Sequence, residues 1–518
     1  MSTDQIIKKY IKDAKTIVHG NMIMFEVTTD KILSVCRELY DRQLPLKIIS
    51  AFDERKEKDL FKVAYVFGLP KQNMFLVPYI MVKDEFPSLT PLIHQASNYE
   101  RKIYTFFGLK PTGHPSLRTL ILHENWPANI FPLRKDFKWN SRPKLANGDF
   151  QFRKLEGEGV YEIPVGPVHA GIIEPGHFRF SVLGEEILLL EPRLGYSHKG
   201  SEKLFEELPL QDKIKLSERI SGDSSFSHSL AFCLALESLG GIKISSRTNY
   251  LRVIFAELER LSNHIGDIGA IMVDTGYNFG GASGARLKEV VMQINEELTG
   301  SRFLRGVSKV GGINATLTTE SIEKLIKSLN QLENDFKEVI HIAENTTTLL
   351  LRLKKTGVLQ AEVARDHGVI GVAGKAIGFE MDARVDYPYA AYNQLQLKIA
   401  TEKGGDVYAR FEVRIKEVYS SIELIKQSLR KLSQSNNDDT KAITFKKNSY
   451  AIGIVEGWRG DIIYLISTDS NGEISRVDVR DPSFLNWAAL GFAGKGNMVP
   501  DFPLINKSFN LSYSGNDL

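Results

Sequence analysis

The chain has 518 residues, of which 42% are hydrophobic and 25% charged, with a formal net charge of only +3. This composition is typical of a globular protein long enough for two to four domains, and the balanced charge gives no indication of nucleic acid as a partner. No apolar run approaches the roughly 20 residues that a membrane-spanning helix needs, and the polar start lacks a signal-peptide core. We therefore expect any membrane association to come through partner proteins.

The chain contains only two cysteines, Cys36 and Cys233. A cluster held by four thiolates cannot be built from two residues, so we expect no iron–sulfur cluster in this chain. Cys233 lies in the apolar run LAFCLALESL, which favours a small buried hydrophobic side chain. So few cysteines in so long a chain favour a reducing compartment.

Residues 1–150 are predicted to form a small mixed α/β module. A helix is expected near Thr29 to Arg42, between alternating apolar stretches that favour strands. These stretches are NMIMFEV, PLKIISAF, FKVAYVFG and NMFLVPYIMV. Proline, asparagine and glycine then gather between Lys138 and Arg153, which indicates a boundary before a second domain over 155–518.

The second domain is predicted to open with a β-hairpin over Val160 to Tyr196, around a Pro-Gly-His loop. Apolar residues then recur at helical spacing in three stretches, which predicts a bundle of long helices. The stretches are Leu251 to Ile265, Ile322 to Val339 and Phe411 to Leu429. A polar run from Ser433 to Thr440 is expected to end the last helix, and a second hairpin is expected around Ser470 to Gly472.

The predicted fold class is therefore α+β: a small N-terminal mixed α/β module and a large, mainly helical domain with peripheral β-hairpins. One segment, Gly276 to Arg286 (GYNFGGASGAR), has the glycine density of a phosphate-binding loop but lacks the G-K-[ST] ending. We interpret it as a glycine-rich turn between two helices. Since no G-x-G-x-x-G follows a strand, NADH binding by this chain is not expected.

Two regions resemble known subunits of respiratory and hydrogen-metabolising complexes. Phe86 to Phe137, with FPSLTP, ER-x-x-Y-x-x-FG, GHP and PLRKDF, resembles the small peripheral subunit of complex I. Tyr161 to Leu518 resembles the large subunit of energy-converting, formate hydrogenlyase-type nickel-iron hydrogenases and the quinone-site subunit of complex I. The motifs that carry this resemblance are GPVH, EPGHFRF, RLGYSHKGSEKL, RTNYLRVIFAELERLSNH, FLRG, GDVYARFEVR and RVDVRDPSFLNW, in that order. The fold of these subunits, hydrogenase large-subunit-like, is implied for the second domain.

In the hydrogenases that the chain resembles, two C-x-x-C segments hold the metals. The matching positions here are Ser221, Ser224, Ser512 and Gly515. A hydroxyl group near neutral pH is neither a thiolate nor a soft ligand. The resemblance therefore implies that all four ligand cysteines are lost, that the chain holds no nickel-iron centre, and that no C-terminal peptide needs to be removed.

The resemblance also implies positions for a redox site. His169 and His177 lie in the loop that in complex I contributes a histidine to the quinone headgroup, whereas the family's tyrosine position corresponds to Gly222. Glu202 matches a carboxylate associated with proton passage, and Lys375 falls where the family usually has an arginine near the metals. Glu202 could instead be an ordinary solvated helix residue.

Asp223, which lies between the two serines of the first segment, and His228, which follows them in SFSHS, complete the set. A buried carboxylate must be paired or protonated, so we expect Asp223 to pair with Lys375 in place of the metals. His228 could also be a hydrogen-bonded helix residue without a chemical role. The candidate catalytic residues are His169, His177, Glu202, Asp223, His228 and Lys375.

The implied function is that of a subunit of a complex I-like or hydrogenase-related oxidoreductase complex at a membrane. It would pass electrons from an iron–sulfur cluster in a partner subunit to quinone or another acceptor, coupled to ion translocation by antiporter-like and other membrane subunits. The chain itself would bind no cofactor, would lack hydrogenase activity, and would lie peripherally on the cytoplasmic face of the inner membrane. The alternative is a non-catalytic structural adaptor, which loss of the ligands and the tyrosine favours.

Overall fold

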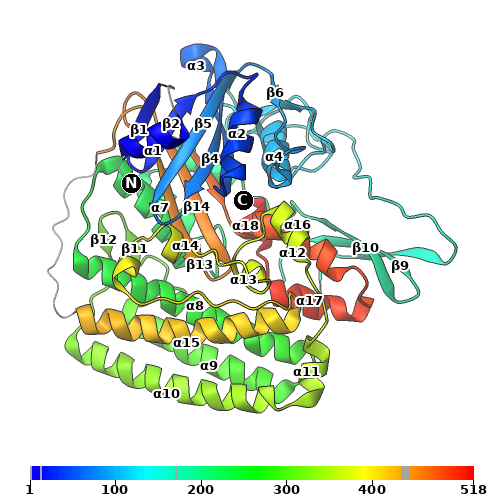
Figure 1. Cartoon of the computed structure of the whole chain (residues 1–518), viewed down its shortest axis with the longest axis vertical. Coiled ribbons are helices and arrows are strands. Elements are labelled where there is room, and N and C mark those ends of the chain that lie inside the picture. The colour runs from blue at the N-terminus through cyan, green and yellow to red at the C-terminus, as the bar shows by residue number, and fades with distance from the viewer. Residues whose placement is uncertain (1–2, 12–14, 170–172, 433–443) are drawn as a thin grey trace.

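The computed structural model describes residues 3–11, 15–169, 173–432 and 444–518, and it confirms the α+β class. The small module lies at one end of the molecule and a layer of long helices at the other (Figure 1). Between them lies a three-stranded antiparallel sheet from the C-terminal part of the chain. The predicted break at Ser433 to Thr440 lies outside the described residues.

The small module is built on a five-stranded sheet in the order β1-β2-β5-β4-β3, in which only β2 and β5 are parallel. All four predicted strands and the predicted helix are confirmed. The elements are α1 (Thr3–Tyr10), β1 (Thr16–His19), β2 (Met22–Glu26), α2 (Ile32–Asp41), β3 (Leu46–Glu54), α3 (Arg55–Lys58), β4 (Leu60–Leu69), β5 (Met74–Val82), β6 (Glu85–Pro87), α4 (Ser97–Phe107) and β7 (Lys110–Thr112).

The helices of the large domain include all three that the apolar spacing predicts. They are α5 (Ser201–Glu207), α6 (Leu210–Ser217), α7 (Ser225–Gly240), α8 (Ser246–Asp274), α9 (Asn278–Thr299), α10 (Thr319–Glu344), α11 (Thr347–Leu353), α12 (Ala361–His367), α13 (Gly371–Lys375), α14 (Ala383–Asp386), α15 (Val407–Leu432), α16 (Ser483–Gly494), α17 (Phe502–Phe509) and α18 (Tyr513–Asp517). Helix α8 packs along both α9 and α15 (Figure 1).

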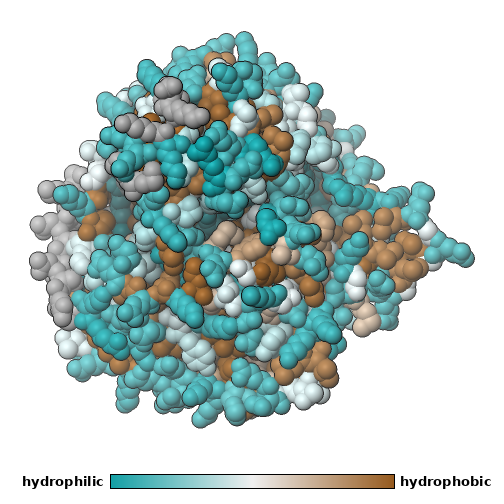
Figure 2. Space-filling view, viewed as in Figure 1, coloured by the Kyte–Doolittle hydropathy of each residue, from teal (hydrophilic) through white to brown (hydrophobic). Residues whose placement is uncertain are grey.

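The strands of the large domain form small antiparallel sheets, as predicted for its hairpins. They are β8 (Val160–Val165), β9 (His177–Leu183), β10 (Glu186–Arg193), β11 (Ser308–Lys309), β12 (Gly312–Ile313), β13 (Tyr450–Gly457), β14 (Gly460–Thr468) and β15 (Ile474–Arg480). The first predicted hairpin gains a third strand, β10. Strands β9 and β10 project from one side of the molecule (Figure 1), where Figure 2 shows a group of hydrophobic side chains.

The glycine-rich segment is a correction to the sequence interpretation, because most of it is helical. Gly280, Gly281 and Gly284 lie within α9, where α9 crosses α8. A Cβ atom on Gly284 would lie 2.6 Å from the Cα atom of Gly269 in α8. The glycines therefore serve close helix packing rather than a turn.

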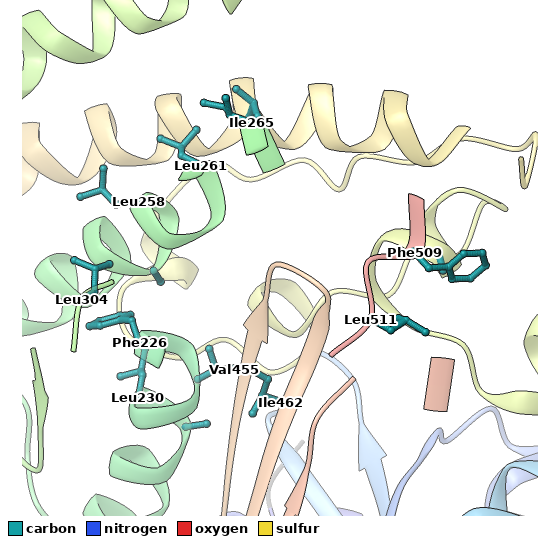
Figure 3. Packing of buried hydrophobic residues seen from close by; sticks show 14 of the residues in the cluster. Phe226, Leu230, Leu258, Leu261, Ile265, Leu304, Val455, Ile462, Phe509 and Leu511 are labelled. Carbon is teal, nitrogen blue, oxygen red and sulfur yellow. The ribbon is translucent and has the colours of Figure 1, made fainter. Parts of the chain in front are cut away.

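The sheet of β13, β14 and β15 is buried on both faces and joins the two parts of the molecule. On one side its apolar residues pack with α7 and α8, as the side chains of Val455, Ile462, Phe226 and Leu258 illustrate (Figure 3). On the other side, residues such as Ile454 join the core of the small module. Both faces of these strands are apolar because each covers a separate core. Within the described part of the chain, no helix has the length and apolar character to cross a membrane.

Candidate functional site

The two serine segments singled out in the sequence, around Ser221 and around Ser512, meet in space. Ser221 lies just before α7 and Ser512 just before α18, and their two hydroxyl oxygens are within hydrogen-bond distance, 2.9 Å apart. The backbone N–H of Gly515 also donates to Ser512 Oγ at 2.9 Å. The geometry therefore brings together two serines that are 291 residues apart in the sequence.

A guanidinium group that the sequence reasoning missed lies between these segments. Arg459, in the tight turn between β13 and β14, donates to Asp223 Oδ1 and Oδ2, each at 2.6 Å. It also donates to Ser221 Oγ at 3.3 Å and to the carbonyl oxygen of Asn510. The Arg459 side chain is 5% exposed and that of Asp223 41%, so a buried cation is covered by a carboxylate that reaches solvent. This bidentate pair is the centre of the candidate site.

The electrostatics keep this pair ionised. Desolvation by the surrounding protein raises the pKa of Asp223, but the charge of Arg459 and its hydrogen bonds outweigh that effect, so the pKa lies below its ordinary value. The Ser221 hydroxyl, at 2.9 Å from Asp223 Oδ1, acts in the same direction. Asp223 is therefore a carboxylate at neutral pH.

The residues present do not fit a nickel-iron centre. The serines offer hydroxyl groups that are bonded to one another, and a cation lies among them. A Cβ atom on Gly515 would lie 2.6 Å from Asp481 Cγ, so the carboxyl group of Asp481 occupies the space of a fourth ligand side chain. Across the described ranges, no group of three or more His, Cys, Asp or Glu side chains is arranged to hold a metal ion.

His228 lies in the same region and is fully buried in α7. Its Nε2 atom is 3.0 Å from Asp481 Oδ2, and its Nδ1 atom is 3.0 Å from the hydroxyl group of Tyr464. Burial raises the pKa of Asp481, but the contact with His228 and other neighbours outweighs that effect, and the net pKa lies below the ordinary value. Asp481 thus joins His228 to the segment that contains Gly515.

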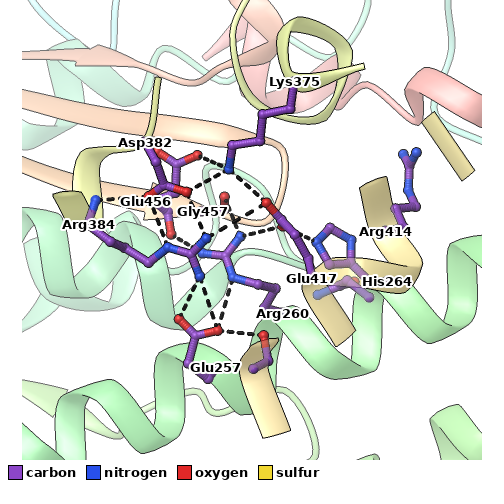
Figure 4. Close-up of polar contacts among 12 residues, drawn as sticks. Glu257, Arg260, His264, Lys375, Asp382, Arg384, Arg414, Glu417, Glu456 and Gly457 are labelled. Carbon is purple, nitrogen blue, oxygen red and sulfur yellow. Dashed lines mark hydrogen bonds and ion pairs between the residues drawn. The ribbon is translucent and has the colours of Figure 1, made fainter. Parts of the chain in front are cut away.

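The predicted ion pair between Lys375 and Asp223 is wrong, because Lys375 pairs with other carboxylates. Its Nζ atom lies 2.7 Å from Asp382, 2.7 Å from Glu417 and 3.2 Å from Glu456 (Figure 4). Three carboxylates already compensate the ammonium group, because α13 places Lys375 against α15 and β13 rather than against α7. Burial lowers the pKa of Lys375, but these carboxylates raise it above its ordinary value.

Lys375 belongs to a buried charge cluster between α8, α13, α15 and β13. Its members are Glu257, Arg260, His264, Lys375, Asp382, Arg384, Glu417 and Glu456 (Figure 4). Four carboxylates face three permanent cations and one histidine. Burial and the neighbouring Asp382 raise the pKa of Glu456 to about 7. The cluster can therefore change its protonation near neutral pH.

Polar contacts connect the Arg459 pair to the edge of this cluster. Asn510, whose carbonyl oxygen accepts from Arg459, donates through Nδ2 to Asp267 Oδ1 at 2.6 Å. Asp267 in turn accepts from Arg414 Nε at 2.9 Å. Arg414 lies one turn of α15 before Glu417.

Glu202 lies between the two parts of the molecule rather than beside Asp223. Its carboxylate is 2.9 Å from Lys102 in α4 of the small module and 3.3 Å from Arg476 in β15. It also accepts from the backbone N–H of Val479 at 2.9 Å. Burial is the main reason that its pKa is raised, against the lowering effect of the two cations. Its role in proton passage stays a prediction.

His169 lies in the loop between β8 and β9, four residues after the end of β8, and His177 is the first residue of β9. Each contacts a loop carbonyl oxygen: His169 Nε2 is 2.8 Å from Gly176, and His177 Nδ1 is 3.3 Å from Gly166. Glu174 of the same loop accepts from the backbone N–H of Ser514 at 3.0 Å. The loop therefore touches the second serine segment, but among the described contacts neither histidine bonds to Asp223 or Lys375.

Glu259 is a further residue that the sequence reasoning missed. From α8 it accepts the backbone N–H groups of Phe226 at 2.6 Å and Ser227 at 3.1 Å, and so caps the first turn of α7. Burial raises its pKa to about 7 although these hydrogen bonds act in the opposite direction. The signal available in the sequence was weak, because Glu259 is one of several charged residues, with Glu257 and Arg260, within a short stretch of a long helix.

Comparison with known proteins agrees with the fusion of two modules. Residues 25–143 match the family described as respiratory-chain NADH dehydrogenase, 30 Kd subunit. Residues 274–451 and 444–517 match the family described as respiratory-chain NADH dehydrogenase, 49 Kd subunit.

Individual relatives extend over most of the chain. Formate hydrogenlyase subunit 5 of Escherichia coli (strain K12) is 32% identical over 481 residues, which cover 91% of this chain and 84% of the relative. Hydrogenase-4 component G of the same organism is 31% identical over 484 residues, which cover 91% of this chain and 83% of that protein. The C/D subunit of NADH-quinone oxidoreductase from Phocaeicola vulgatus is 29% identical over 405 residues, which cover 74% of this chain and 78% of that protein.

The two fused modules and the order of the shared segments define a complex I-like, hydrogenase-related oxidoreductase subunit. The chain belongs to the family that contains formate hydrogenlyase subunit 5 and the fused C/D subunits of NADH-quinone oxidoreductase. The family resemblance inferred from the motifs is therefore confirmed.

Proposed function

We propose that this chain is the subunit at which a complex I-like oxidoreductase, peripheral to a membrane, delivers electrons to quinone or a related acceptor. Electrons come from an iron–sulfur cluster in a partner subunit, in two one-electron steps, and the acceptor takes up two protons to form a quinol. Antiporter-like membrane subunits couple this reaction to ion movement, on the cytoplasmic face of the inner membrane. The chain holds no nickel-iron centre.

The observation that carries this proposal is the Arg459–Asp223 pair at the place of the metals. Arg459 is buried and positively charged, so it supplies a fixed charge beside a position where negative charge develops on an acceptor. Asp223 is exposed enough to meet a molecule bound at the surface. Asn263 donates to the backbone carbonyl oxygens of both Asp223 and Glu259, and burial together with the charge of Asp223 raises the pKa of the Glu259 carboxyl group to about 7. A group that can exchange a proton near neutral pH is therefore electrostatically linked to the pair.

We further propose that the chain divides into residues 1–150 and 155–518, and that His169, His177, Glu202, Asp223, His228 and Lys375 contribute to electron and proton transfer. Their arrangement supports different roles. Asp223 and His228 adjoin the serine segments, and His169 and His177 lie on either side of Glu174, whose carboxylate contacts Ser514 in one of them. Glu202 and Lys375 lie in two other charge clusters.

The test uses the complex purified from membranes through a tag on this chain. With reduced methyl viologen as donor and a short-chain quinone as acceptor, Asp223→Ala should lower the rate about tenfold or more, because the Arg459 guanidinium group loses the carboxylate that orients it. Asp212→Ala, at an exposed acid on α6, should leave the rate unchanged. Elemental analysis that finds about one nickel per chain would contradict the absence of a nickel-iron centre.

A non-catalytic adaptor is the second candidate, and a specific observation favours it. Both carboxylate oxygens of Asp223 accept short hydrogen bonds from Arg459, so the two side chains already satisfy each other. The predicted partner Lys375 lies in another cluster. If Asp223→Ala leaves both the assembly of the complex, seen on native gels, and the quinone rate unchanged, the adaptor replaces the catalytic proposal.

A further inference from the structure

A cavity of about 510 Å³ lies at the junction of the small module and the large domain. The small module contributes residues of α4 and of the segment that follows β7, such as Arg101 and Arg118. The large domain contributes residues of β10 and α16, such as Arg193 and Trp487. A cavity of this volume is large enough for a small organic ligand.

The cavity is strongly basic. The cationic side chains that line it are Arg101, Arg118, Arg153, Arg193 and Lys495. Glu191 is the one carboxylate in the lining, and it pairs with Arg118 at 3.1 Å. Glu124, just outside the lining, pairs with Arg193 at 2.7 Å. Three of the five cations thus lack an ion pair among the described residues, and the lining has a clear excess of positive charge.

Arg101 shows most directly that this charge is uncompensated. Its guanidinium group donates to the carbonyl oxygens of Arg118 at 3.0 Å and Thr119 at 2.9 Å, and to the Asn98 side chain at 3.2 Å. Burial, and next the nearby Arg118, Arg193 and Arg153, lower its pKa to about 10. Neighbouring cations that repel one another in a half-buried space are stabilised when an anion binds between them.

Flat rings lie among the cations. The guanidinium carbons of Arg193 and Arg118 lie 4.5 Å and 5.5 Å from the ring centre of Phe150. On the opposite domain, the rings of His367 and Phe492 are 5.1 Å apart, and Trp487 also lines the cavity. Arginine forks suit phosphate oxygens, and aromatic faces suit a planar ring.

We propose that this cavity binds a small organic polyanion that joins phosphate groups to a planar ring, as in a nucleoside polyphosphate. The site is distinct from the Arg459–Asp223 pair and goes beyond the proposed electron transfer. The two adjoin, because the indole N–H of Trp487 donates to the carbonyl oxygen of Ser512 at 3.1 Å and Asn516 lines the cavity. A ligand there contacts both modules and can fix the position of the second serine segment.

Binding is tested by calorimetry with ATP, tripolyphosphate and adenosine, on the purified full chain and on the complex isolated from membranes. ATP should bind more tightly than tripolyphosphate, adenosine should not bind, and the affinity for ATP should fall as salt is raised. Arg153→Glu with Lys495→Glu should weaken ATP binding about tenfold or more. Both side chains are exposed and form no described ion pair, so the fold should be unaffected.

The matched control is Lys327→Glu with Arg430→Glu, two exposed basic residues on α10 and α15, which should bind ATP as the unchanged chain does. Equal weakening by both pairs of substitutions would overturn the proposal, since it would indicate non-specific attraction. Absence of binding to the unchanged chain would overturn it too. Binding by the chain but not by the complex would assign the cavity to a partner subunit, and equal binding of tripolyphosphate and ATP would overturn the role of the rings.

Discussion

At the residue scale, the two serine segments meet in a closely packed polar site. The serines keep hydrogen-bonding capacity, and the guanidinium group of Arg459 fills the volume between the two segments. Its charge is compensated by Asp223, and the Asp481 carboxyl group occupies the side-chain space at Gly515. A cysteine placed at one of these positions would therefore be surrounded by Arg459, Asp223 and Asp481 rather than by other thiolates.

Glu259 gives a pH-dependence prediction. Its pKa is raised in the folded chain from an ordinary value of 4.5 to about 7. The folded state therefore binds the proton more tightly than the unfolded state, and this contributes stability below about pH 4.5 that is lost as the pH rises through about 7. A shift of this size corresponds to a change on the order of 3 kcal/mol in the free energy of unfolding.

The comparison is with Glu259→Gln, which cannot ionise. Between pH 5 and pH 8, a range of about 3 pH units around the expected titration, the free energy of unfolding of the unchanged chain should fall relative to that of the variant. The infrared carbonyl band of protonated carboxylic acid that titrates near pH 7 should be weaker in Glu259→Gln than in the unchanged chain, because Glu456 still titrates in this range in both. A constant difference in stability across this range would contradict the raised pKa.

At the element scale, periodicity predicted most of the architecture. The stripe from Leu251 to Ile265 falls inside α8, and NMFLVPYIMV coincides with β5, because burial of one helix face or of alternating strand residues leaves a regular pattern. The site was less predictable. Arg459 is 236 residues from Asp223, and nothing in the local sequence GWRG specifies its partner.

A signal for Arg459 did exist in the sequence. Glu456, Arg459 and Asp461 interrupt an otherwise apolar hairpin, and charges in a buried strand need partners. Which partners they take depends on how α7, α13 and α15 surround the sheet, and this is a property of tertiary packing. The same reason explains why Lys375 was wrongly predicted to pair with Asp223. The position of Lys375 in the family motif gave no information about the three carboxylates that surround its ammonium group.

The crossing of α8 and α9 gives a prediction for an element. Gly284 is buried with its Cα atom against Gly269, and a Cβ atom would lie 2.6 Å from the Cα atom of that residue. Gly284→Val should therefore destabilise the chain by about 1–3 kcal/mol, since the added atoms force the helices apart. Ala285→Val, at the neighbouring exposed position, introduces valine into the same helix without the clash and costs only the lower helix propensity of valine relative to alanine, whereas Gly284→Val has no such propensity cost. Equal unfolding temperatures for the two variants would show that the crossing tolerates a larger separation.

At the scale of the whole molecule, the fusion of two modules is more than a covalent link. The apolar cores meet through β13 to β15, and buried ion pairs cross the junction: Lys102 to Glu202 and Asp478, and Lys47 to Asp461, each at 2.9 Å. The basic cavity lies at the same junction. The relative position of the modules is thus held by both apolar and charged contacts, and a ligand or partner at the junction acts on both modules.

Lys102 tests how strongly this junction depends on charge. Its ammonium group is buried between Glu202 and Asp478, so Lys102→Met leaves two carboxylates that share Arg476 as their remaining cation. Breaking a buried pair on one side costs about 3–5 kcal/mol. Lys110→Met, at an exposed lysine of the same module, should change the stability by much less.

The measurement is limited proteolysis together with chemical unfolding of the full chain. Lys102→Met should expose the segment between the modules, around residues 138–153, to faster cleavage, and it should lower the unfolding midpoint. The loss should be greatest at neutral pH and smaller in acid, because protonation of Glu202, whose pKa burial raises, removes one of the uncompensated charges. If Lys102→Met and Lys110→Met are cleaved at the same rate, the apolar contacts through β13 to β15 alone hold the modules together.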